Sequence, residues 1–152
     1  MSLSSSSDLE VRPLRGLMVR EPWASLILRG EKTWEIRGTR TSHRGEIYLI
    51  RSGTGRVVGS CRIIDVLGPL TIEDMRLNAE AHLTPESELI LGGLPYRNTY
   101  AWVLAEPRTF EEPIPYKHPS GAITWVDLNE LREELPCRRA SVLRSPEYSA
   151  SS

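Results

Sequence analysis

Three residues that can bind an anion or move a proton lie close together in the first quarter of the chain. Residues 28–38 run Leu-Arg-Gly-Glu-Lys-Thr-Trp-Glu-Ile-Arg-Gly, which places Lys32, Glu35 and Arg37 within six positions. A glutamate between two cations orients both of them. The cations then keep N–H donors for an anion such as a phosphate. The spacing therefore predicts an anion-binding cluster organised by Glu35.

The cluster needs a strand and a rigid turn to hold it. Trp34 and Ile36 alternate with polar residues, which predicts a short strand with one buried face and with Glu35 and Arg37 together on the other face. Gly30 is suited to end a preceding helix in a left-handed conformation, so Lys32 would lie at a helix-to-strand turn. The alternative is a ladder of surface ion pairs on an edge strand, each worth only about 0–1 kcal/mol.

The order Gly-x-Lys-x-x-Glu-x-Arg over residues 30–37 resembles the signature of the ASCH domain family, which has a PUA-like fold. Flanking segments at residues 16–24, 43–50, 112–115 and 121–125 resemble further parts of that family in the same order. The resemblance covers about residues 15–128. It implies an α+β, mainly β protein, a small PUA-like β-barrel flanked by about three helices.

The pattern along the chain predicts elements consistent with that fold. We expect strands at residues 15–20, 33–37, 45–50, 57–67, 98–110 and 122–126, and helices starting at residue 22, spanning 71–81 and spanning 127–135. Gly59 and Ser60 indicate a bulge or a close backbone approach within a strand. Residues 51–56 form a turn, and residues 82–96 an insertion or lid. One domain, 15–136, follows a disordered lead-in at 1–14 and precedes a polar tail at 137–152.

Composition limits the classes of function. The 152 residues carry a net charge of −1, which excludes a bulk polycation, but residues 1–62 hold a net +5 and residues 63–152 a net −6. A basic half that contains the motif suits an anionic ligand. We expect no membrane-spanning helix and no secretory signal, and hence a cytoplasmic protein. Cys61 lies in an apolar strand-like run and Cys137 in the polar tail, so no disulfide is expected. No cysteine–histidine spacing indicates a metal site, and no cofactor is expected.

These observations favour an RNA- or nucleotide-binding domain with a basic cleft built on the motif. Arginines near the motif would bind phosphates together with Lys32 and Arg37. Glu35 would hold the arginines in place or accept a hydrogen bond from a base amino group. An aromatic ring would stack on a base. Trp34 and Tyr116 are further stacking candidates. The predicted binding residues are Arg20, Trp23, Lys32, Glu35, Arg37, Arg40, His43, Arg44, Ser52 and Trp125.

Two other functions remain open at this point. The resemblance implies a hydrolase as one of them, because some small relatives are amidohydrolases on acetylated cytidine that use a lysine-activated threonine. Lys32 matches that lysine, but Glu35 occupies the threonine position, so we expect no acetylcytidine hydrolysis. If the protein is an enzyme, Lys32 and Glu35 are the catalytic candidates, with Glu35 as a general base for water. Alternatively, Lys32 and Arg37 would stabilise a phosphorane during metal-free RNA cleavage. The other function is a protein-interaction adaptor that uses the proline-rich residues 113–119.

Overall fold

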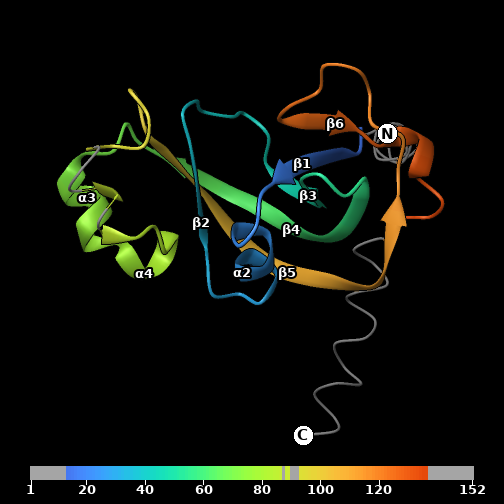
Figure 1. The fold of residues 1–152 in the computed structure, drawn as a ribbon, viewed down its shortest axis with the longest axis horizontal. Coiled ribbons are helices and arrows are strands. Elements are labelled where there is room, and N and C mark those ends of the chain that lie inside the picture. The colour runs from blue at the N-terminus through green and yellow to red at the C-terminus, as the bar shows by residue number, and fades with distance from the viewer. Residues whose placement is uncertain (1–12, 87, 90–92, 137–152) are drawn as a thin grey trace, which may run out of the picture.

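A single curled sheet of six strands positions the motif at one of its edges. The computed structural model describes residues 13–86, 88–89 and 93–136. The strand order is β2-β5-β4-β3-β1-β6, and among these strands only the β1–β3 pair is parallel (Figure 1). The strands are β1 (Arg15–Val19), β2 (Trp34–Arg37), β3 (Gly45–Arg51), β4 (Arg56–Leu67), β5 (Tyr100–Pro115) and β6 (Trp125–Asp127).

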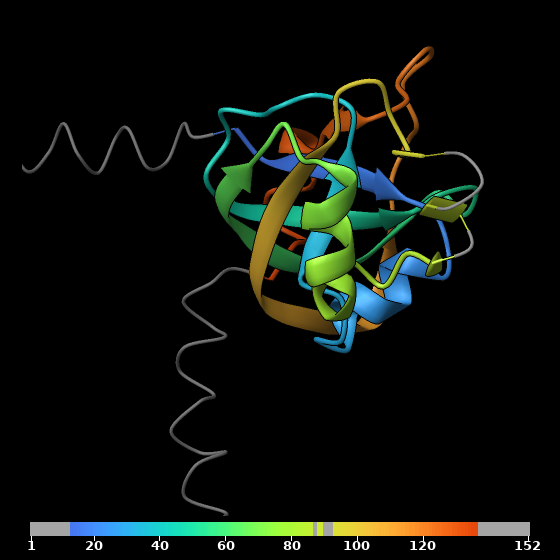
Figure 2. The same ribbon diagram turned by 90° about the vertical axis from the view of Figure 1, so that its left-hand side faces the viewer.

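Three short α-helices lie against this sheet in the described part of the chain. The helix α2 (Trp23–Leu28) contacts β3, β4 and β5. The helices α3 (Ile72–Leu77) and α4 (Ala79–His82) lie beside the β2–β5 edge, as Figure 2 shows. The predicted mainly-β α+β fold, a small barrel-like sheet flanked by about three helices, is confirmed. None of the described helices has the length and apolar character needed to cross a membrane.

Both faces of the sheet are covered, and the period of two along β3 shows how. Ile47 and Leu49 pack in the cluster that includes α2, whereas Tyr48 and Ile50 pack in a second cluster with the segment that follows β6. Gly59 of β4 is the point of closest approach. A Cβ there would lie 2.3 Å from the Arg108 backbone oxygen, so the close approach expected at this glycine is confirmed.

Two predicted helices differ from those observed. The capping box of Thr71 and Asp74 is present, but the helix ends at Leu77 because Asn78 leaves helical geometry and bonds the Asp74 carbonyl, and α4 then starts separately. The helix predicted at 127–135 was wrong: only a 3₁₀ turn, η1 (Asn129–Leu131), forms there. The Asp127 side chain accepts from the Asn129 amide, a local bond that competes with a helix start.

The predicted lead-in and tail fall almost entirely on residues 1–12 and 137–152, outside the described residues. The domain boundaries therefore remain predictions.

Candidate ligand-binding site

Strand β2 presents Glu35 and Arg37 to the inside of the curled sheet. It pairs with β5 at the sheet edge, with Glu35 opposite Trp102. Ile36 points the other way and packs with Met75 of α3. The Glu35 residue is only 5% exposed, so both faces of this edge strand are covered and the surface-ladder alternative is excluded.

A rigid turn places Lys32 beside Glu35. Gly30 has a φ of +79°, as predicted for the residue that ends the helix, and the Leu26 carbonyl accepts from the Lys32 amide at 3.1 Å. The Lys32 residue is 3% exposed, and its Nζ donates to the His82 carbonyl at 2.7 Å. The same Nζ lies 3.9 Å from Glu35 Oε1 and 4.8 Å above the Trp23 ring.

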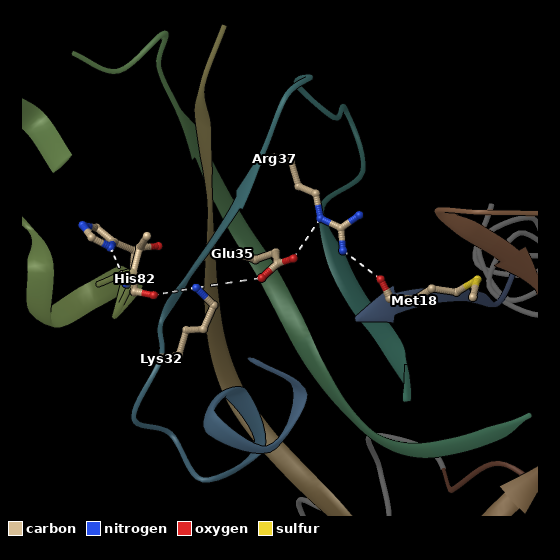
Figure 3. A network of polar contacts seen from close by, with 6 residues as sticks. Met18, Lys32, Glu35, Arg37 and His82 are labelled. Atoms are coloured by element: carbon tan, nitrogen blue, oxygen red, sulfur yellow. Dashed lines mark hydrogen bonds and ion pairs between the residues drawn. The ribbon is translucent and has the colours of Figure 1, made fainter. Parts of the chain in front are cut away.

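Arg37 links strand β2 to strand β1 through hydrogen bonds to Glu35 and Met18. Its Nε donates to Glu35 Oε2 at 2.8 Å, and its Nη2 donates to the Met18 carbonyl of β1 at 2.8 Å. Figure 3 shows the Glu35 carboxylate lying between the Lys32 amine and the Arg37 guanidinium. The edge strand β2 is thereby tied to β1 although the two strands do not pair.

Burial lowers the pKa of Lys32 and of the neighbouring His82. Desolvation lowers the pKa of Lys32 to about 8, with the Glu35 carboxylate opposing the shift and the Arg37 charge adding to it. Desolvation also lowers the pKa of His82, against the hydrogen bond to the Met75 carbonyl. His82 Nδ1 accepts from the Thr84 amide at 2.9 Å, so the neutral ring carries its proton on Nε2, 2.6 Å from the Met75 oxygen.

A cavity of about 370 Å³ opens in front of the cluster. Six of the predicted binding residues line it: Arg20, Trp23, Lys32, Glu35, Arg37 and Ser52. It is also lined by residues that sequence analysis did not select: Met18, Ile36, Thr84, Glu88, Pro95, Tyr96 and Ile123. Four of these seven come from residues 84–96, so the segment predicted as an insertion or lid supplies part of the cavity wall.

The structure places the other four predicted residues elsewhere. Arg40 donates to the Gly68 carbonyl at 3.2 Å, and Arg44 donates to backbone carbonyls of its own loop. The rings of His43 and Trp125 lie 5.7 Å apart, and Trp125 stacks on Trp102 in the core. These four residues do not line the cavity.

Tyr96 is the most informative of the residues missed. It is 43% exposed at the cavity, and a Cβ added to Gly38 would lie 2.9 Å from its Cδ1, so the ring rests on the glycine that follows Arg37. Hydrogen bonds between Thr99 Oγ1 and the Tyr96 backbone, at 3.0 and 3.3 Å, hold it there. Residues 38 and 96 are far apart in the sequence, so sequence analysis could not pair them. The glycine at position 38 was the only signal that another residue approaches closely there.

The fold and the site define a small α+β domain of the PUA-like type, with a polar cavity beside an edge strand. The sequence profile of the ASCH domain matches residues 17–114, and the chain belongs to the ASCH domain family.

Solved structures agree with this assignment of the fold. The ASCH protein from Zymomonas mobilis superposes with a TM-score of 0.61 at 13% identity, covering 79% of this chain and 90% of that one. A tyrosine-to-phenylalanine mutant of the same Zymomonas mobilis protein gives 0.62 at 14% identity, covering 81% and 95%. A search of curated proteins found no match.

Proposed function

We propose that this ASCH domain binds RNA or a nucleotide, with one nucleotide unit in the cavity formed by the motif. The observation that carries the proposal is the geometry of Lys32 and Arg37, two largely buried cations held by one buried carboxylate at the wall of a cavity. A volume of about 370 Å³ falls in the range of small-ligand sites. Fixed donors of this kind suit the oxygen and nitrogen atoms of a base, sugar or phosphate.

The exposure of the cations suggests separate roles. Arg20 lines the cavity but is exposed, so we assign it to a phosphate at the solvent side. Lys32 and Arg37 lie deeper and are assigned to the base or sugar. The exposed ring of Tyr96 supplies a surface on which a base can stack, which is worth about 1–3 kcal/mol.

Fluorescence anisotropy with a labelled octamer of mixed-sequence RNA tests these separate roles of Arg20 and Lys32. Arg20→Ala should lower the slope of log K against log salt by about 0.7, the value for one phosphate contact on a single strand. Lys32→Met should weaken binding with little change of slope. Arg29→Ala is the matched control, because Arg29 pairs with Glu31 on the surface and does not line the cavity. If both the Arg20 and the Lys32 variants bind RNA with wild-type affinity, the proposed binding site is wrong.

A hydrolase is the second candidate, favoured by the lowered pKa of Lys32. An amine with a pKa of about 8 in a cavity is partly neutral in mildly alkaline solution, as a general base must be. Ser52 and Thr84 bring hydroxyl groups to the same cavity, and Glu35 brings a carboxylate. Mass spectrometry of RNA or acetylcytidine after incubation at pH 7–9 tests it. Turnover that rises through pH 8 and is lost in Lys32→Met would favour the enzyme.

A further inference from the structure

The ends of four neighbouring strands, in the order β5-β4-β3-β1, bring basic residues together beside the cavity. Arg51 at the end of β3 pairs with Val19 of β1 on one side and with Arg56 of β4 on the other. Arg56 also lies opposite Pro115 of β5. Neighbouring strands are about 4.8 Å apart, so the four strand ends span about 14 Å. We call the cations at or just beyond these ends the basic row: Arg20, Arg51, Arg56 and Lys117.

The basic row is continuous with the cavity. Arg20 and Ser52 both line the cavity. The Ser52 amide donates to the last carbonyl of β1 at 3.0 Å, which holds the β3–β4 turn against the end of that strand. On the other side of the turn, the Tyr116 amide donates to the Gly55 carbonyl at 3.1 Å, which places Lys117 next to the turn. A ligand in the cavity can therefore extend along the row without leaving the protein surface.

Three of the four cations lack an acidic partner. Arg20, Arg56 and Lys117 are exposed, and none of them forms an ion pair with another residue that the structure describes. Arg51 Nε lies 2.6 Å from Glu21 Oε2. Arg51 and Arg56 lie directly opposite each other in the β3–β4 ladder, and like charges in that position repel. A bound anion would offset this repulsion, so the row favours a ligand with several negative charges.

The β3–β4 turn adds backbone donors to the row. The amides of Gly53 and Gly55 donate no hydrogen bond within the described part of the chain. These glycines have φ values of +84° and +68°, and a Cβ at either would meet no atom beyond its chain neighbours within 4 Å, so the turn is open to a ligand. Thr54 fixes the turn, because its Oγ1 donates to the Arg51 carbonyl and accepts from the Arg56 amide. Exposed amides in a fixed turn suit phosphate oxygens.

We propose that the basic row binds the phosphates next to the nucleotide in the cavity, so that the ligand is a single-stranded oligonucleotide and not a free nucleotide. This inference rests on the proposed function and names the ligand of the same site. A mononucleotide places its phosphate at Arg20 and has no charge for the rest of the row. Each further phosphodiester of a single strand adds one negative charge along it. A single strand also leaves a base free to enter the cavity, which a duplex does not.

Competition against the labelled RNA octamer tests the length of the site in the wild-type protein. Unlabelled mono-, di- and tetranucleotides of uridine should displace the octamer with an affinity that increases at each step. If the mononucleotide and the tetranucleotide compete equally well, the inference is overturned.

The variant Arg56→Ala tests the row itself. It should lower the slope of log K against log salt for the octamer by about 0.7, which corresponds to a loss of about eightfold at about 50 mM salt and about threefold at about 200 mM. Arg56→Lys keeps the charge and should restore most of the slope. Arg15→Ala is the matched control, because Arg15 is exposed, has no ion pair among the described residues and lies at the opposite end of β1 from Arg20. If Arg56→Ala binds like Arg15→Ala, the row is not a phosphate site.

Two further competitors test the chemistry of the ligand. An RNA duplex of the same sequence and an octamer of glutamate should both compete more weakly than the single strand, because neither offers a free base to the cavity. If either competes as well as the single strand, the row attracts polyanions in general and the inference is wrong.

The two proposals fail in different ways. If octamer binding depends on neither Lys32 nor Arg20, the proposed function fails, and this inference fails with it. If octamer binding depends on Lys32 but not on Arg56 or Lys117, RNA binding at the cavity stands and the basic row is wrong.

Discussion

The burial of Lys32 should make the free energy of unfolding depend on pH. Its pKa is about 8 in the folded protein against an ordinary value of 10.5, so between these values the folded protein holds fewer protons than the unfolded chain. Stability therefore rises as the pH rises from about 8 to about 10.5. The difference between these two pKa values corresponds to a gain of about 3 kcal/mol in the free energy of unfolding.

Lys32→Met isolates this effect, because methionine keeps the length of the side chain and cannot titrate. We expect urea unfolding of the wild type at several values between pH 7.5 and 10.5 to show the gain, and the variant to lack it. The sequence offers a matched control, since Lys117 is the only other lysine and is exposed. The variant Lys117→Met should follow the wild-type profile. Other groups that titrate in this range are common to all three proteins and cancel in the differences.

The lowered pKa of Lys32 can be observed directly by NMR. With ¹³C-labelled lysine the protein has only two lysine side chains to follow by NMR, and one of them should titrate near pH 8. If no lysine titrates near pH 8, or if the stability profiles of Lys32→Met and the wild type are parallel, the assignment of Lys32 as a desolvated ammonium group is wrong.

Three further changes test the packing around the site. Gly38→Ala should displace the Tyr96 ring and weaken RNA binding about as much as Tyr96→Ala does; anisotropy in which only the Tyr96 variant loses affinity would contradict this. Gly59→Ala should lower the free energy of unfolding by about 1–3 kcal/mol because a Cβ would overlap the backbone of β5, and a thermal midpoint equal to the wild type would refute it. The pKa of His82 is lowered, so the unfolded chain takes up the proton first and stability should fall as the pH drops below about 6.5. In His82→Gln this part of the acid dependence should disappear from the unfolding curves, and its persistence would assign it to another group.

Local signals were sufficient for much of the fold. The alternation around Trp34 and Ile36 predicted β2, and Gly30 predicted the end of α2, because both depend on the backbone preferences of a few neighbouring residues. The capping box at Thr71 was found for the same reason. Local signals failed at Asn78 and Asp127, where side chains that bond to the nearby backbone ended or prevented a helix.

The sequence by itself determined the three charged groups of the site and their order along one short segment. It did not determine that both faces of β2 would be covered, since it assigned one face of that strand to the core and the motif charges to the other. Only the tertiary structure brought the His82 carbonyl to Lys32, the Met18 carbonyl to Arg37 and the Tyr96 ring to Gly38. Each of these contacts joins residues distant in the sequence, and curling of the sheet decides which of them meet. Arg40, His43, Arg44 and Trp125 show the converse, because nearness in sequence to a motif or a strand does not place a side chain in the cavity.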